Sequence, residues 1–129
     1  MCYACYIVRM QQNGYLRQNF TLMILTDLEI LKALEDGNIV IEPYRPECLG
    51  TNSYDVHLGK WLAVYENHEL DAKKHNTIRH FEIGAEGFVL QPGTLYLGVT
   101  QEYTETHHTV PFLEGKSSIG RLEIGRAHV

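Results

Sequence analysis

Residues 115–121 read Gly115-Lys116-Ser117-Ser118-Ile119-Gly120-Arg121, which places two basic side chains, two hydroxyls and two glycines within one short stretch. Lysine provides a mobile charge, arginine provides a planar fork that binds an oxyanion through two hydrogen bonds, and hydroxyls and backbone amides provide neutral donors. The composition therefore favours a binding site for a polyphosphate. A second interpretation stays open, in which a serine caps a helix start and the lysine and arginine are simply solvated.

A Walker P-loop is excluded as the origin of this stretch. That motif needs a further glycine at a fixed distance upstream of the Gly-Lys-Ser, and Val110 occupies the position. Any phosphate site here must therefore be of another kind.

Five further motifs precede the stretch in a defined order. They are Met23-Ile24-Leu25-Thr26-Asp27, Ile39-Val40-Ile41-Glu42-Pro43-Tyr44, Ser53-Tyr54-Asp55-Val56-His57-Leu58-Gly59, Leu90-Gln91-Pro92-Gly93 and Leu97-Gly98-Val99-Thr100-Gln101-Glu102-Tyr103. With the Gly-Lys-Ser-Ser-x-x-Arg stretch, their order and spacing resemble the dCTP deaminase branch of the dUTPase-like superfamily. The resemblance covers Met23 to Leu122, and its last motif is the most specific.

The residue pattern independently predicts one helix followed by many short strands. Thr26 and Glu29 have the spacing of a capping box, and Leu28, Ile30, Leu31 and Leu34 give an apolar helical face that ends at Gly37. Short apolar runs separated by Gly, Pro and Asn follow, and they predict an antiparallel sandwich or jelly-roll-like barrel. The runs are Ile39–Ile41, Tyr54–Leu58, Trp61–Tyr65, Thr77–Ile83, Phe88–Leu90, Leu95–Thr100 and Thr109–Leu113. The polar stretch Glu66–Asn76 is predicted to be a surface loop.

The resemblance implies the same architecture. We expect a mainly β, dUTPase-like distorted jelly-roll or β-barrel with a short N-terminal helix, incomplete at the C-terminus in this chain. Relatives of this kind usually form a homotrimer with active sites at the subunit interfaces.

The length of 129 residues indicates a single domain. Because the resemblance begins at Met23, residues 1–22 are interpreted as an extension outside the domain, and residues 23–122 as the N-terminal part of the dCTP deaminase/dUTPase-like domain. Residues 124–129 match the translation of a common sequencing-library adapter. The adapter begins with the bases AG, which would convert a preceding codon that begins with G into the GAG codon of Glu123. We therefore expect residues 123–129 to be an adapter-derived tail and the chain to be a gene fragment.

The resemblance implies zinc-independent hydrolytic deamination of dCTP to dUTP and ammonia, in which a glutamate transfers the protons. Ser117 would lie beside that glutamate and the attacking water, and Arg121 would orient the glutamate and stabilise charge. Lys116 and Ser118 would contact the triphosphate, and Ile119 and Gly120 would line the segment. The glutamate belongs to a later strand that this chain does not contain, and neither Glu114 nor Glu123 replaces it. We therefore expect the fragment to be inactive alone.

Magnesium is the expected cofactor, bound with the triphosphate. The resemblance places Asp55 near it, through water, and the alternative is a structural aspartate that accepts hydrogen bonds from backbone amides at a turn. A zinc site is not expected. His80-Phe81-Glu82 is an isolated His-x-Glu, and Cys2-Tyr-Ala-Cys5 lies far upstream without the proline of zinc deaminases. His107 and His108 are adjacent, so on a strand they would point to opposite faces.

The composition limits the possible partners. A net charge of −5 argues against polymeric nucleic acid, and there is no apolar run of about 20 residues to span a bilayer. Three cysteines without a signal peptide argue against a disulfide framework. We expect a cytoplasmic protein whose partner is dCTP or dUTP.

Three functions remain open from the sequence. The first is a dCTP deaminase, and the second is a bifunctional deaminase and diphosphatase or a plain dUTPase. The third is a non-catalytic nucleotide-binding relative, which the missing glutamate would permit.

Overall fold

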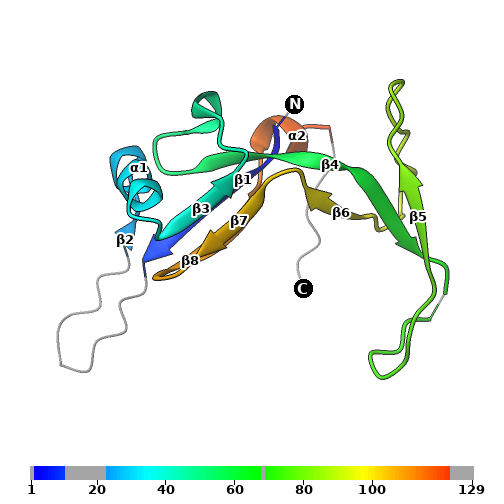
Figure 1. Ribbon diagram of the computed structural model, residues 1–129. Coiled ribbons are helices and arrows are strands. Elements are labelled where there is room, and N and C mark those ends of the chain that lie inside the picture. The colour runs from blue at the N-terminus through cyan, green and yellow to red at the C-terminus, as the bar shows by residue number, and fades with distance from the viewer. Residues whose placement is uncertain (1, 11–22, 68, 123–129) are drawn as a thin grey trace. The chain divides into compact units, whose positions relative to one another are not determined.

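A computed structural model describes residues 2–10, 23–67 and 69–122, with side chains described from residue 24 onward. These ranges are mainly β, which confirms the predicted fold class. The elements, shown in Figure 1, are β1 (Cys2–Met10), β2 (Met23–Ile24), α1 (Asp27–Glu35), β3 (Ile39–Glu42), η1 (Pro46–Cys48), β4 (Tyr54–Tyr65), β5 (Ile78–Glu82), β6 (Leu97–Thr100), β7 (Tyr103–Thr106), β8 (Thr109–Gly115) and α2 (Ser117–Gly120). None of the helices in the described ranges combines the length and apolar composition needed to cross a membrane.

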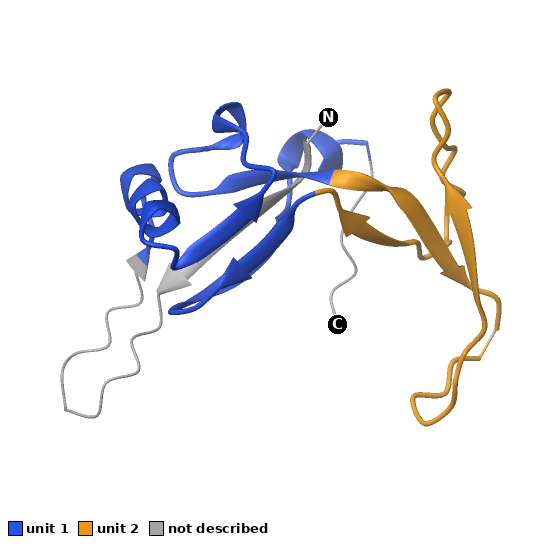
Figure 2. Cartoon of the chain, in the orientation of Figure 1, with its two compact units in different colours: residues 1–57, 102–126 blue, residues 58–101, 127–129 orange. Residues whose placement is uncertain are grey.

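The chain divides into two compact units, coloured separately in Figure 2. Unit 1 comprises residues 1–57 and 102–126, and unit 2 comprises residues 58–101 and 127–129. The strand β4 begins in unit 1 and ends in unit 2. The residues of the candidate site belong to unit 1.

In unit 1, β1 pairs antiparallel with β2, β4 and β8. The pairing with β8 is long and runs from Ala4 opposite Gly115 to Met10 opposite Thr109. A separate antiparallel ribbon joins β3 to β7. The interpretation of residues 1–22 as an extension outside the domain stays a prediction, and residues 11–22 lie outside the described ranges, as do residues 123–129.

The core of unit 1 is a single apolar cluster between α1, the β3–β7 ribbon and the first half of β4. Its buried members are Leu25, Ile30, Ile39, Ile41, Cys48, Tyr54 and Val56. Tyr54 and Val56 occupy alternate positions of β4, so the residues between and after them, Asp55 and His57, lie on the other side of the strand. This alternation places polar side chains directly behind the core.

The predicted capping box of α1 is confirmed. The Glu29 amide donates to Thr26 Oγ1 at 3.4 Å, and the Thr26 amide donates to Glu29 Oε2 at 2.8 Å. The hydrogen bond from the Thr26 amide, with a smaller one from the Thr26 hydroxyl, lowers the pKa of Glu29. At the other end, Gly37 has a φ of 70°, and the Asn38 amide reaches back to the Ala33 carbonyl at 2.8 Å, which closes the helix as expected.

The predicted apolar face of α1 is partly wrong. Ile30 is fully buried, and Ala33 and Leu34 pack against the same cluster. Leu28, by contrast, is 72% exposed, and Leu31 is 37% exposed. The buried face follows positions i, i+3 and i+4 from Ile30, and the leucine repeat that begins at Leu28 diverges from that face.

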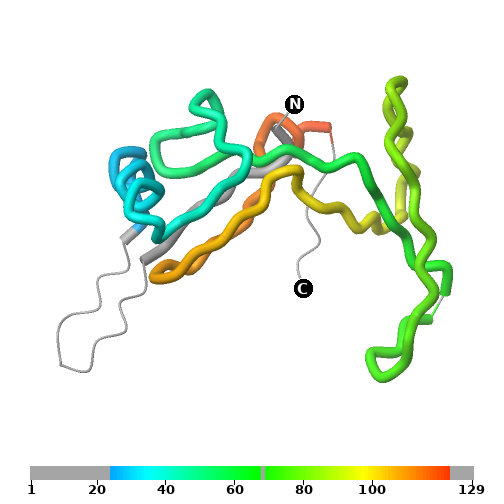
Figure 3. The backbone as a smooth tube through the Cα atoms, viewed as in Figure 1, coloured from blue at the N-terminus to red at the C-terminus, as the bar shows by residue number. Residues whose placement is uncertain are grey.

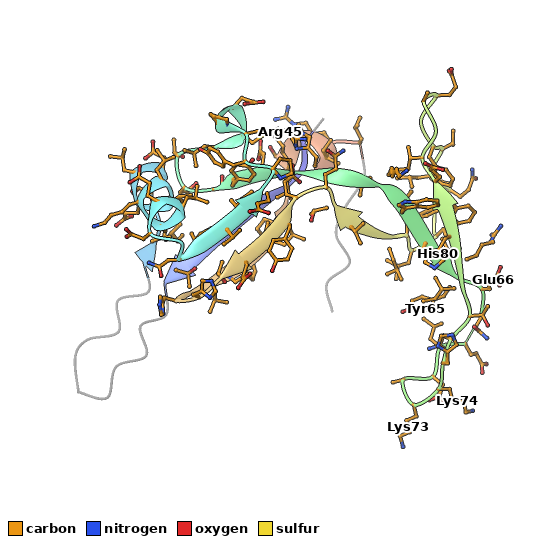
Figure 4. All side chains as sticks on the ribbon, in the orientation of Figure 1. Arg45, Tyr65, Glu66, Lys73, Lys74 and His80 are labelled. Carbon is orange, nitrogen blue, oxygen red and sulfur yellow. The ribbon has the colours of Figure 1, made fainter. Side chains whose placement is uncertain are left out.

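In unit 2, the second half of β4 pairs with β5 on one side and with β6 on the other. The approach of β6 is close. A Cβ on Gly59 would lie 2.9 Å from the Val99 carbonyl oxygen, and one on Gly98 would lie 2.8 Å from Leu58 Cδ1. Figure 3 shows the backbone leaving β4, forming the loop predicted for residues 66–76, and returning as β5. Figure 4 shows Lys73 and Lys74 at the tip of that loop.

Three strand predictions need correction. The runs Tyr54–Leu58 and Trp61–Tyr65 form one strand of 12 residues, because Gly59 packs against β6 instead of breaking the chain direction. Phe88–Leu90 is not a strand and follows a tight turn in which Gly87 has a φ of 86°. The strands β1, β2 and β7 correspond to none of the predicted runs, although the Tyr and Thr residues of β7 are good strand formers.

Candidate functional site

Residues 115–121 form the junction between β8 and α2. β8 ends at Gly115, Lys116 is the N-cap residue, and Arg121 follows the single helical turn as its C-cap. The Ile119 and Gly120 amides donate to the Lys116 carbonyl at 2.9 Å and 3.0 Å. No side chain caps the helix start, so the alternative prediction of a serine cap is wrong.

The side chains of this junction divide into one anchor and an exposed polar set. Ile119 is 5% exposed and fixes the helical turn to the interior. Ser117, Ser118, Gly120 and Arg121 are all exposed. The hydroxyls and the guanidinium predicted to contact nucleotide therefore lie at the surface, where a ligand can reach them.

Lys116 is held by Asp55 of β4. Its Nζ donates to Asp55 Oδ2, with side-chain exposures of 37% and 23% for the two residues. The structure thus joins two predicted site residues that are far apart in the sequence. Lys116 is therefore not simply solvated, and Asp55 lies within a strand instead of at a turn.

A second charged cluster lies beside this pair and was not predicted. Glu102 Oε1 lies 2.7 Å from Arg45 Nη1 and 2.7 Å from His57 Nδ1, and Glu102 Oε2 accepts from the His57 amide at 2.8 Å. Arg45 Nη1 is also 2.9 Å from His57 Nδ1. Because a carboxylate only accepts hydrogen bonds, Glu102 favours the His57 tautomer that carries its proton on Nδ1 and donates it to Oε1. Figure 4 labels Arg45 in this region of unit 1.

Glu102 is buried, at 3% exposure, and remains a carboxylate. Burial by itself raises the pKa of Glu102, but hydrogen bonds from the His57 amide and ring outweigh burial, and the pKa is lowered. His57 and Glu102 occur inside the quoted motifs, yet nothing in a local pattern marks a glutamate after a β-rich run as buried. The burial of Glu102 results from its contact with His57, which is distant in the sequence.

Tyr54 supports this cluster from the core side. Its hydroxyl accepts from the Arg45 amide at 2.8 Å, and its ring stacks on Tyr44 with centroids 5.5 Å apart. Burial raises the pKa of Tyr54 to about 12. Arg45 is therefore fixed through its backbone as well as through its side chain.

The other residues considered as metal ligands do not gather. Within the described ranges no three His, Cys, Asp or Glu side chains are arranged to hold a metal ion. His107 lies between β7 and β8, with Nε2 3.3 Å from Glu105 Oε1. The side chains of Cys2 and Cys5 lie outside the described part of the chain.

Fold and site together define a β protein with an exposed polar junction beside a charged strand. The model of the dCTP deaminase-like family matches residues 24–129, and the chain belongs to that family.

Curated relatives agree with this assignment. Over 100 residues the chain is 55% identical to "dCTP deaminase, dUMP-forming" of Leptospira biflexa serovar Patoc, covering 78% of this chain and 57% of the relative. The protein of the same name from Cytophaga hutchinsonii is also 55% identical over 100 residues, with the same coverage. A "dCTP deaminase" of Rhodopirellula baltica is 50% identical over 101 residues, covering 78% of this chain and 50% of the relative. The chain thus spans about half the length of these relatives.

Proposed function

We propose that the whole protein binds dCTP at the β8–α2 junction and catalyses its hydrolytic deamination without zinc. The contact between Lys116 and Asp55 carries the proposal, because it brings the cation of the junction to the polar side of β4. The exposed Ser117, Ser118 and Arg121 complete a set of donors suited to a triphosphate. Family membership and the names of the relatives support dCTP as the nucleotide.

The residues from Lys116 to Arg121 each have a proposed role. Lys116 and Ser118 bind the triphosphate, and Ile119 and Gly120 give the segment its shape. Ser117 positions the attacking water, and Arg121 orients the general-base glutamate and stabilises the charge that develops on the reacting ring. We do not assign the general base to Glu114, which lies in β8 before the junction.

Asp55 fits an indirect role toward magnesium. A single half-buried carboxylate offers a hard oxygen donor, and magnesium commonly keeps most of its waters and uses one or two carboxylates with substrate phosphates. When bound, magnesium neutralises charge on the triphosphate. Asp55 would contact one of its waters.

The product is the point at which a second candidate arises. The sequence predicted dUTP, whereas two of the relatives carry names that specify dUMP formation. We therefore consider a bifunctional enzyme that also cleaves the triphosphate as the alternative to a plain dCTP deaminase.

One assay separates these possibilities. The protein is incubated with dCTP and magnesium, and ammonia, pyrophosphate, dUTP and dUMP are quantified while calorimetry measures nucleotide binding. Ammonia with dUTP supports the plain deaminase, and ammonia with pyrophosphate and dUMP supports the bifunctional enzyme. For the whole protein, saturable binding without turnover supports a non-catalytic relative, and for residues 1–129 alone the same result supports their predicted inactivity. Failure to bind dCTP, or equal affinity for dCTP and dCMP, contradicts the proposal.

The assembly expected from the resemblance, a homotrimer with shared active sites, belongs to the same proposal. Light scattering after size-exclusion chromatography, with and without dCTP, measures it.

A further inference from the structure

The pair formed by Lys116 and Asp55 unites two residues with opposite proposed partners. Lys116 is proposed to bind phosphate, and Asp55 is proposed to face the waters of magnesium. Here they bind each other, with both side chains partly accessible. Phosphate must therefore compete with the Asp55 carboxylate for the Lys116 ammonium.

The competition has a defined electrostatic sign. A triphosphate that approaches Lys116 also approaches the negative charge of Asp55, so the carboxylate opposes binding by occupying the ammonium and by repelling the ligand. A hydrated cation beside Asp55 would remove both effects, because it offers the carboxylate a positive partner in place of the lysine.

The strand that carries Asp55 is held in place independently of Lys116. The Glu102 carboxylate accepts from the His57 amide at 2.8 Å, and the neighbouring Val56 is in the core. An exchange of partners between the Asp55 and Lys116 side chains therefore leaves β4 unchanged.

We propose that Asp55 makes polyphosphate binding at the β8–α2 junction depend on magnesium. Without the metal, Asp55 holds Lys116 and weakens phosphate binding. With the metal, Asp55 turns to its water shell and Lys116 binds phosphate. This inference rests on the proposed phosphate site, and it assigns Asp55 the control of that site in addition to a contact with the metal.

The test measures binding of inorganic tripolyphosphate by calorimetry, with and without magnesium, so that no turnover is needed. The variants are Asp55→Asn, Lys116→Gln and the double substitution. The matched control is Glu82→Gln, which removes one carboxylate from the exposed Lys60–Glu82 pair of unit 2 and gives the same change in net charge. Circular dichroism verifies that each variant is folded.

We expect magnesium to tighten binding to the unsubstituted chain by about threefold to tenfold, the range that a partly exposed ion pair of about 1 kcal/mol allows. Asp55→Asn should tighten metal-free binding by a similar factor and reduce the magnesium effect to less than about twofold. In the Lys116→Gln background the gain from Asp55→Asn should shrink to the part that repulsion of the ligand by the carboxylate gives. Glu82→Gln should behave like the unsubstituted chain.

Several results would overturn the inference. Equal gains from Asp55→Asn in both backgrounds would show plain repulsion, and an unchanged magnesium effect in Asp55→Asn would remove Asp55 from control. Absence of any tripolyphosphate binding would overturn both the inference and the proposed phosphate site. If tripolyphosphate binding follows the expected pattern but the whole protein does not turn over dCTP, the inference stands and the proposed activity is wrong.

Nuclear magnetic resonance of the unsubstituted chain provides a second measurement should Asp55→Asn fail to fold. The Asp55 carboxylate carbon should shift when tripolyphosphate and magnesium are added together, and the Lys116 side chain should respond far more strongly to the pair than to tripolyphosphate alone. A full Lys116 response to tripolyphosphate alone contradicts the proposal.

Discussion

Glu102 shows how a single buried carboxylate organises its surroundings. Its two oxygens accept from a strand amide and an imidazole, and one of them also pairs with Arg45. The amide and the imidazole both belong to His57, and the guanidinium belongs to Arg45 in another segment, so removal of the charge leaves several buried or half-buried donors without their acceptor.

We predict that Glu102→Gln lowers the free energy of unfolding at pH 7 by about 1.5 to 3 kcal/mol, the range for hydrogen bonds to a charged group. The pKa of Glu102 is lowered from its ordinary value of 4.5, so its stabilising contribution is present above that value and is lost as the pH falls through the folded-state pKa. Urea unfolding at several pH values should therefore show a smaller loss of stability under acid in Glu102→Gln. Glu82→Gln is the exposed control, and an identical acid dependence in all three proteins would contradict this account.

A second residue-scale prediction separates binding from chemistry in the whole protein. Lys116→Ala should mainly raise KM for dCTP, because the lysine is a point charge directed at phosphate. Arg121→Ala should mainly lower kcat, by about 1.5 to 3.7 decades, which corresponds to a charged contact worth about 2 to 5 kcal/mol in the transition state. Steady-state kinetics measures both. Near-normal kcat in Arg121→Ala would remove this residue from the proposed catalytic set.

At this scale the sequence predicted the members of the junction but not their partners. The Gly-Lys-Ser-Ser-x-x-Arg stretch is local, so its chemistry can be read directly. The pairing of Lys116 with Asp55, and of Glu102 with Arg45 and His57, depends on which strands become neighbours. No local pattern contains that information.

At the scale of elements, α1 also shows that local features are predictable from the sequence whereas contacts with distant segments are not. Its capping box and its end at Gly37 involve residues within one turn of each other, and both were predicted correctly. Its buried face was only partly predicted, since the face is chosen by the strand it packs on. In β4, the prediction that Gly59 divides two strands is wrong, because this glycine marks a close approach of β6 and not the end of a strand.

We predict that Ile30→Ala and Leu28→Ala differ sharply although both shorten an aliphatic side chain in the same helix. Ile30 is fully buried, so its truncation should cost about 2 to 5 kcal/mol of stability. Leu28 is 72% exposed, so its truncation should change stability by about 0.5 kcal/mol or less. Thermal and urea unfolding of both variants measure this difference. Similar losses would support the leucine face predicted from the sequence.

At the scale of the whole molecule, burial is distributed unevenly between the two units. The continuous cluster around Ile30, Ile39, Tyr54 and Val56 lies in unit 1. In unit 2 the most buried apolar side chains are Leu62, Ala63 and Val64, at 6 to 8% exposure, and β5 and β6 are largely exposed.

We therefore predict slower amide hydrogen exchange in β3 and the first half of β4 than in β5 and β6. Amides whose opening requires disruption of the core exchange only through large-scale unfolding, whereas strands with exposed side chains open locally. Exchange followed by mass spectrometry with overlapping peptides measures the contrast. Uniform protection across both units would contradict it.

The alternation along β4 also constrains how the gene can vary. Tyr54 and Val56 lie in the core, while Asp55 and His57 hold the charged partners on the reverse side. A substitution alters one side of the strand at a time. An inserted or deleted codon instead shifts every later side chain of the strand to the opposite side, so that core residues face the site and site residues face the core. We expect codon gains and losses among relatives to be absent from residues 54–57 and to accumulate in the loop at residues 66–76, where a change of length alters neither side.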